Sequence, residues 1–263
     1  MSQPILLDIH GAIATVTFNR PHALNAVNLS MARALRDAAE ELSARMDLRV
    51  IVLRGAGTAF MAGGDVQAFR GPPEVVRMVA GEILDHLHGF ILQMQTSRQL
   101  VIGAVQGAAA GGGFGIALAT DITICADTAR FAPAYRLLGA SPDCGCSFFL
   151  PQLAGSKKAA EMLFSGAIYS AEEALQLGLV TAVVPAIEFD AVVCRMAVKI
   201  AEQNASSAAA ATKALLKRRL IEPLREHLAE EKRAFLECVS SEDFSEGVRA
   251  FIDKRRPIFS VIQ

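Results

Sequence analysis

Hydrophobic positions along the chain follow two different periods. Short apolar runs rich in β-branched residues predict strands, and these runs are Ile5–Ile9, Ile13–Phe18, Arg49–Leu53, Leu100–Val105, Asp121–Cys125 and Leu179–Val184. Stretches with apolar residues three and four apart predict helices, and these are Leu29–Met46, Pro73–Gln95, Phe114–Thr120, Phe148–Phe164 and Ala174–Leu177. Strands that alternate with helices predict an α/β fold with functional loops at the ends of its strands.

Local signals mark where several predicted helices begin and end. Asn28 or Ser30 can cap the first helix, and the sequence Ser170-Ala-Glu-Glu173 has the spacing of a capping box. Pro151 or Gly155 is expected to break the stretch Phe148–Phe164. These residues predict the helix boundaries more sharply than periodicity alone.

The last quarter of the chain carries no strand signal. Ala191–Lys254 is predicted to be helical throughout, with mixed charge over much of its length. We therefore expect a core over residues 1–195 that holds the functional site, and a helical region over residues 196–263. The apolar stripes of these helices need a cover, which predicts either packing against the core or self-association.

Composition excludes several classes of function. The 263 residues are 52% hydrophobic, and 26 Lys and Arg against 27 Asp and Glu leave a net charge of -1. Such a balance gives no general attraction to nucleic acid, so we predict no nucleic-acid partner. Five widely spread cysteines and the lack of a secretory segment at the start predict a reducing, cytoplasmic setting.

Two segments have alternative interpretations. The apolar stretch from Leu100 to Thr120 is almost long enough to span a bilayer, but its six glycines favour a strand, a tight turn and a buried helix, so no membrane span is predicted. Cys144-Gly-Cys146 could suggest metal or redox chemistry, yet no second cysteine pair or nearby histidine completes a zinc set. We predict small buried side chains there and no metal.

Two glycine-rich turns, Gly55–Asp65 and Gly107–Gly115, each follow a predicted buried strand and lead toward a helix. Unpaired N–H groups at a helix start attract negative charge, and glycine lets another molecule approach closely. Two such turns that converge would form an oxyanion hole. The alternative is that these glycines only permit tight packing, and Asp65 is itself expected to be a helix cap.

Several segments together resemble the crotonase superfamily, the enoyl-CoA hydratases and isomerases. The segments that carry the resemblance are Asn19–Asn28, Ala59–Asp65, Gly107–Gly115, Phe131–Pro133 and Leu153–Gly155, and the match runs from about residue 5 to Phe251–Pro257. The resemblance implies a spiral of ββα units with a C-terminal helical region that forms trimers or dimers of trimers. It also implies an acyl-CoA thioester as substrate and no further cofactor.

The resemblance also assigns candidate site residues. It implies that the backbone N–H groups of Gly64 and Gly112 bind the thioester carbonyl. It further implies that five residues lie along the CoA cleft, namely His22, Ala23, Ala62, Gly64 and Asp65.

The candidate catalytic side chains differ from those of the hydratases. The two glutamates that activate water in enoyl-CoA hydratases correspond to Gly115 and Tyr135, so both are absent. Asp143 stands among apolar residues, which should raise its pKa and suit it to proton transfer. Pro142–Gly145 resembles the segment of isomerase members in which an acidic residue moves a proton between C2 and C4. The alternative is that Asp143 only caps a helix or lies in a surface turn.

Three other functions stay open from the sequence. Hydration of a 2-enoyl-CoA is one, and a catalytically silent acyl-CoA binder is another. The third is a dehalogenase of the 4-chlorobenzoyl-CoA type, in which Asp143 would attack an aromatic ring and His88 would assist hydrolysis. Tyr135 stands where that type has a tryptophan, and it could hydrogen-bond Asp143 or line an acyl pocket. His88 could equally be a packing residue of its helix.

Overall fold

A six-stranded sheet forms the centre of the molecule in the computed structural model, which describes residues 3–260. Its strands in spatial order are β1 (Ile5–His10), β2 (Ile13–Phe18), β3 (Val50–Gly55), β4 (Leu100–Val105), β6 (Ile122–Ala126) and β9 (Ala182–Val184). β1 pairs antiparallel with β2, and every later pair in this sheet is parallel. The predicted strand pair and the predicted α/β class are therefore confirmed.

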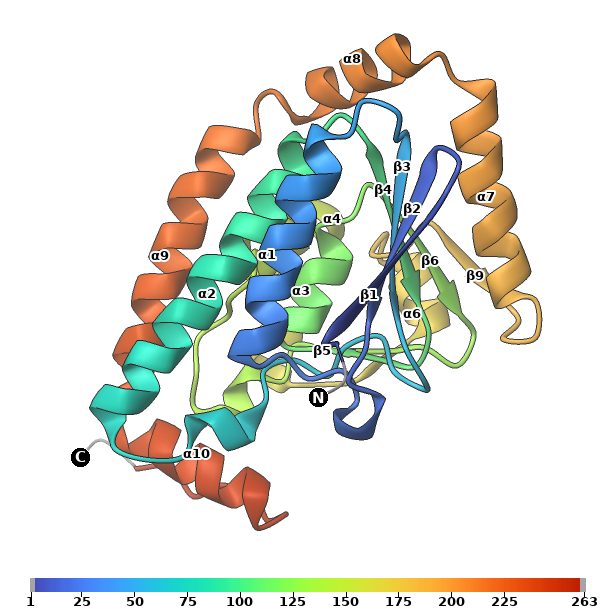
Figure 1. The fold of residues 1–263 in the computed structure, drawn as a ribbon. Coiled ribbons are helices and arrows are strands. Elements are labelled where there is room, and N and C mark those ends of the chain that lie inside the picture. Colours follow the sequence, from blue (N-terminus) through green and yellow to red (C-terminus); the bar gives the residue numbers. More distant parts are fainter. Residues whose placement is uncertain (1–2, 261–263) are drawn as a thin grey trace.

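Helices cover both faces of this sheet (Figure 1). α1 (Leu29–Ala44) and α2 (Pro73–Thr96) lie on one face, and α7 (Phe189–Gln203) covers the other. Alternate residues of β3 point into two separate cores, with Ile51 toward α1 and Val52 toward α7. Burial on both faces explains why these strands appear in the sequence as continuous apolar runs.

A second, three-stranded sheet was not predicted. It consists of β5 (Ala108–Ala110), β7 (Arg130–Ala132) and β8 (Tyr169–Ser170). The remaining short elements are η1 (Pro21–Ala23), η2 (Val66–Phe69), α3 (Gly112–Leu118), η3 (Tyr135–Leu138), α4 (Cys146–Ala154), α5 (Ser156–Ser165) and α6 (Ala171–Gln176). Strands of two or three residues are too short to show a period of two, so the sequence carries no signal for them.

The predicted helix signals act mostly where they were expected. The Asn28 side chain accepts a hydrogen bond from the Met31 amide, and Ser170 forms the predicted capping box with Glu173. The predicted break falls at Gly155, whose φ of 82° is in the left-handed region, while Pro151 lies inside α4. The helix predicted over Phe114–Thr120 begins two residues earlier, because Gly112 already has helical geometry.

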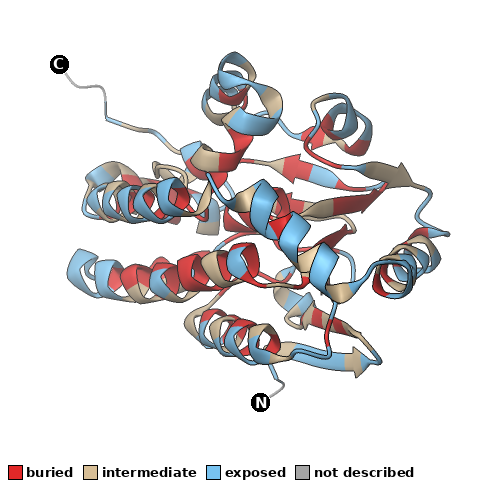
Figure 2. Ribbon diagram, turned by 90° about the horizontal axis from the view of Figure 1, so that it is seen from above, coloured by how far each residue is buried: buried red, intermediate tan, exposed pale blue. Residues whose placement is uncertain are grey.

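The C-terminal helices pack against the core. They are α7, α8 (Ser206–Lys217), α9 (Ile221–Val239) and α10 (Glu242–Ile252). α9 lies along α2, and α8 crosses one end of the molecule between α7 and α9 (Figure 1). The expected domain boundary at residue 195 falls inside α7, which packs on the sheet. Figure 2 shows that the outward faces of the helices are the exposed ones.

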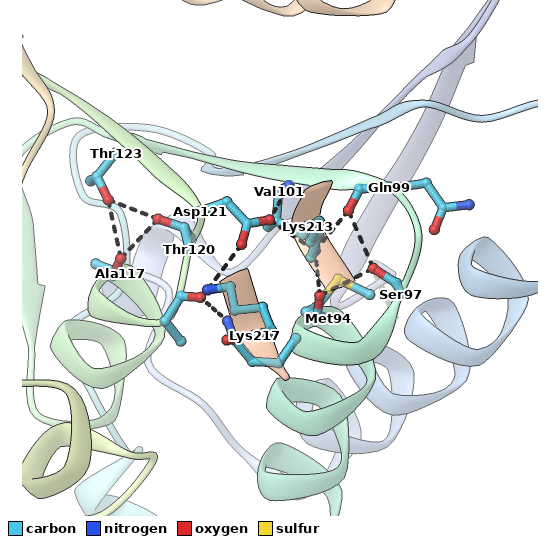
Figure 3. Close-up of polar contacts among 12 residues, drawn as sticks. Met94, Ser97, Gln99, Val101, Ala117, Thr120, Asp121, Thr123, Lys213 and Lys217 are labelled. Atoms are coloured by element: carbon cyan, nitrogen blue, oxygen red, sulfur yellow. Dashed lines mark hydrogen bonds and ion pairs between the residues drawn. The ribbon is translucent and has the colours of Figure 1, made fainter. Parts of the chain in front are cut away.

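A buried ion cluster attaches α8 to the sheet (Figure 3). The Lys213 ammonium lies 2.8 Å from Asp121 Oδ2 and donates hydrogen bonds to the Met94 and Gln99 carbonyls, and Lys217 contacts Asp121 Oδ1 at 3.0 Å. Burial lowers the pKa of Lys213, and the charge of the Asp121 carboxylate opposes that shift. The cluster fixes α8, and through it the start of α9, to the ends of α2 and β4.

Within residues 3–260, no helix is long and apolar enough to cross a membrane. All five cysteines are free, and no group of three or more metal-binding side chains comes together in that part of the chain.

Candidate active site

The two glycine-rich turns lie side by side. The Met61 amide donates to the Ala108 carbonyl, and the Ala110 amide donates to the Met61 carbonyl, so the first turn adds to the edge of β5. A Cβ on Gly113 would lie 2.2 Å from the Met61 carbonyl oxygen, so only glycine fits there. The two turns therefore meet at the edge of β5, as an oxyanion hole built from both of them would require.

Gly64 and Gly112 line one cavity of about 100 Å³. Gly112 is the first residue of α3, where an amide has no partner inside the helix. Within residues 3–260, neither the Gly64 amide nor the Gly112 amide donates a hydrogen bond to a backbone carbonyl in the turns and loops. Two free N–H groups therefore border the same cavity, with Gly64 at the exposed side and Gly112 buried.

Apolar side chains form most of the cavity wall. α2 contributes one face with a spacing of three and four, through Ala80, Ile83, Leu84 and Leu87. η2, α9 and α10 contribute Phe69, Phe235 and Phe251. Such a wall suits a hydrocarbon chain, and it leaves the chemistry to the few polar groups among the lining residues.

Asp143 is the single acidic side chain that lines this cavity in the described part of the chain. It is 9% exposed, and its Oδ1 accepts a hydrogen bond of 2.9 Å from the Tyr135 hydroxyl. Burial raises the pKa of Asp143 to about 7, against the lowering effect of the Tyr135 hydrogen bond. The expectations of a raised pKa and of a contact with Tyr135 are confirmed, and the alternative of a surface turn is wrong.

The Gly115 position has no room for an acidic side chain. A Cβ on Gly115 would lie 2.6 Å from the carbonyl oxygen of Cys144, so the segment that carries Asp143 fills that space. The other position, Tyr135, is buried and directs its hydroxyl at Asp143. The site thus holds one carboxyl group where a hydratase of the expected kind would hold two.

The residues expected along the CoA cleft take different places. Ala62 lines the cavity, whereas His22, Ala23 and Asp65 lie outside its lining. The Ala62 amide donates to the Leu24 carbonyl, which brings η1 with His22 and Ala23 next to the glycine turn.

Asp65 has the capping role expected from the sequence. It accepts a hydrogen bond of 3.2 Å from the Gln67 amide at the start of η2, and it forms an ion pair of 2.8 Å with Arg20. The helix that it caps is a short 3-10 turn rather than an α-helix.

His88 does not line the cavity. The face of α2 toward the cavity runs through Ile83, Leu84 and Leu87, and His88 stands at its edge, about 40° round the helix from Leu84 and about 100° from Leu87. His88 is buried, its Nε2 has no hydrogen-bond partner within the described residues, and burial lowers its pKa to about 4. A neutral side chain in this position packs between helices, which agrees with the alternative that His88 is a packing residue of its helix.

One polar contact to the site was not predicted from the sequence. Glu231 of α9 reaches the segment that follows Asp143 and accepts hydrogen bonds from the Gly145 and Ser147 amides. Glu231 lies in a run of mixed charge, and the sequence of that run does not distinguish the one buried carboxylate from its exposed neighbours. Its position inside the apolar stripe of Leu224, Leu228 and Phe235 is the signal that could have identified it.

Comparisons with known proteins identify the family of this chain. The family described as "Enoyl-CoA hydratase/isomerase" matches residues 8–261. A "Probable enoyl-CoA hydratase" of Rhodobacter capsulatus is 36% identical over 97% of both chains. A "Short-chain-enoyl-CoA hydratase" of Clostridium acetobutylicum is 33% identical, with 96% of this chain and 95% of the relative covered.

A solved structure extends the likeness to the fold. The crystal structure of an enoyl-CoA hydratase from Mycobacterium avium subsp. paratuberculosis superimposes with a TM-score of 0.89 at 29% identity, over 98% of this chain and 99% of the other. The family match spans both glycine turns, the Asp143 segment and the C-terminal helices. The chain is an acyl-CoA enzyme that belongs to the enoyl-CoA hydratase/isomerase family.

Proposed function

We propose that this protein isomerises the double bond of an enoyl-CoA, with Asp143 as the group that moves the proton. The observation that carries the proposal is a single buried carboxyl group beside two free backbone amides in an apolar cavity. Its pKa of about 7 lets it accept and return a proton near neutral pH.

The proposed steps need no second acid. Asp143 removes a proton from C2 of a 3-enoyl-CoA, and the electrons of that C–H bond move onto the thioester oxygen. The Gly64 and Gly112 amides stabilise the resulting dienolate by hydrogen bonds to that oxygen. Asp143 then returns the same proton to C4, which leaves a 2-enoyl-CoA and the ionised aspartate of the starting state.

Hydration has weaker support from the site. It requires a group to activate water and a group to protonate the substrate carbon, which two carboxyl groups share in hydratases of the expected kind. Here the Gly115 position is filled by backbone, and Tyr135 bonds to Asp143. The names of the relatives favour hydration, so the two reactions must be compared directly.

Parallel assays on 3-enoyl-, 2-enoyl- and aromatic acyl-CoA substrates test the proposal. We expect rapid conversion of the 3-enoyl-CoA to the conjugated 2-enoyl-CoA. The absorbance of the conjugated thioester measures the rate of this conversion. Hydration of the 2-enoyl-CoA at an equal or higher rate would overturn the assignment. Tight binding without turnover of any substrate would indicate an acyl-CoA binder instead.

Replacement of Gly112 by proline tests the proposed amide donor. Proline is tolerated at the first position of a helix, but it removes the N–H group, so we expect kcat to fall by about 10² to 10³-fold. Gly112→Ala is the matched control, because both variants add a Cβ facing Cys144 Sγ at 3.1 Å and only proline removes the donor. Steady-state kinetics of the two variants give the measurement. Equal losses in both would show that crowding, rather than the lost hydrogen bond, is responsible.

A further inference from the structure

The segment that carries Asp143 ends in an unusual helix start. Cys144 and Gly145 both have left-handed backbone geometry, with φ of 53° and 75°, and Gly145 is the N-cap of α4. Glycine has no side chain to bond the free amides of the first turn. The Asp143 side chain does not supply that bond either, because it points to Tyr135.

Glu231 supplies the missing cap from another helix. Its Oε2 accepts a hydrogen bond of 2.7 Å from the Gly145 amide, and its Oε1 accepts one of 2.9 Å from the Ser147 amide. The Ser147 hydroxyl also lies 2.5 Å from Oε1. Glu231 is 5% exposed, so a carboxylate has been buried here to hold two backbone amides. Such a bidentate contact fixes both ends of the turn.

We propose that Glu231 is a positioning residue for Asp143, since it caps α4 across the molecule and so leaves the Asp143 side chain free to face the cavity. The inference rests on the proposed function of Asp143 as the proton-transfer group. α9 also carries Phe235, which lines the cavity, so the same helix forms part of the acyl wall and holds the acidic segment.

Charge gives Glu231 a second effect on the same group. The carboxylate of Glu231 lies close enough to raise the pKa of Asp143, in addition to the larger effect of burial. The other titratable groups that face Asp143 or Glu231 are Tyr135 of η3, Cys144 of the turn, Cys146 of α4 and His227 of α9. Glu231 is the one carboxyl group among the titratable neighbours of Asp143, so its removal is expected to lower the pKa of Asp143.

Ser147 and His227 complete the arrangement without forming a nucleophile. His227 Nε2 lies 2.8 Å from the Ser147 hydroxyl oxygen. The serine has a single proton, and at 2.5 Å it is directed to Glu231, so His227 donates to the serine oxygen. The histidine therefore does not act as a base toward Ser147, and both residues support the Glu231 carboxylate.

Glu231→Gln tests the inference, because it removes the charge and keeps a similar shape. We expect kcat for the 3-enoyl-CoA to fall by about tenfold or more, since the turn loses one of its bonds. We also expect the acidic limb of the kcat/KM profile to move to lower pH, because Asp143 loses a neighbouring negative charge. NMR titration of the Asp143 carboxyl carbon, with no substrate present, should move in the same direction.

Two further variants separate the possible outcomes. Glu231→Asp keeps the charge but shortens the reach, so we expect a lower kcat with the acidic limb almost unmoved. Glu230→Gln is the matched control, because its exposed carboxylate bonds Arg233 rather than the turn, and it should leave kcat and both titrations unchanged.

The proposal and the function on which it rests can fail separately. A folded Glu231→Gln protein with wild-type kcat would overturn the positioning role, and an unmoved acidic limb with an unmoved Asp143 titration would overturn the effect of the Glu231 charge. Full kcat in Glu231→Asp would overturn it as well, and this variant serves if Glu231→Gln does not fold. A wild-type protein with no isomerase activity would refute the proposed function, while the NMR titration would still decide the effect of Glu231 on Asp143.

Discussion

Asp143→Asn is expected to lower kcat for conversion of a 3-enoyl-CoA to a 2-enoyl-CoA by about 10⁴-fold, at the upper end of what a single proton-transfer group contributes. Asparagine has nearly the same shape and can still accept the hydrogen bond from Tyr135. It cannot take a proton from C2 at neutral pH, and no other acidic side chain lines the cavity within residues 3–260. Steady-state rates followed through the conjugated product give the measurement.

Binding must be measured beside activity in the same variant. The apolar wall and the free amides of Gly64 and Gly112 remain, so we expect the Kd for a saturated acyl-CoA to change by less than about threefold, by calorimetry. Asp190→Asn is a suitable control, because Asp190 is an exposed carboxylate on α7 that pairs with Arg54. An Asp143→Asn protein with wild-type kcat would place the base elsewhere.

The same substitution is expected to stabilise the protein at alkaline pH. The pKa of Asp143 is about 7 in the folded protein, against about 3.9 for an unfolded aspartate. Below about pH 4 the Asp143 carboxyl is protonated in both the folded and the unfolded state, so it does not lower the free energy of unfolding. Between about pH 4 and 7 only the unfolded chain ionises, so the free energy of unfolding falls, and above pH 7 the loss is complete.

A shift of about three units corresponds to a cost of as much as about 4 kcal/mol. Asp143→Asn removes this cost, so its free energy of unfolding should exceed that of the wild type by up to about 4 kcal/mol near pH 8.5 and by little near pH 4. Urea denaturation at the two pH values gives the measurement. Equal stability of the two proteins at both would mean that Asp143 is not held in a desolvated site.

Much of the fold could be predicted because the large sheet is buried on both faces. Strands such as β3 and β4 are continuous apolar runs, and α1 buries one stripe, so their patterns identify them. The small sheet was not predicted because β5, β7 and β8 have only three, three and two residues. Their pairing depends on contacts between distant parts of the chain, which a single sequence does not display.

The candidate site could be predicted where it depends on local motifs. Gly64 and Gly112 follow buried strands, and Asp143 stands in an apolar segment, so each carries its own signal. His88 was assigned to the site by counting along the helix, but it follows Leu84 by one turn and Leu87 by one residue, so only the packing of α2 decides whether it lines the cavity. Glu231 lies 86 residues from Gly145 in sequence, and nothing short of the packing of α9 brings the two together.

The contact between Gly115 and the Cys144 backbone limits how this enzyme can change its reaction. A carbonyl oxygen 2.6 Å from the Cβ position leaves no path by which one codon change could add an acid there. A carboxylate at position 115 would first require the 143–147 segment to be rebuilt, together with its anchor on α9. Evolution of an acid at this position therefore passes through several coupled substitutions, and directed evolution toward it should begin with a library in that segment.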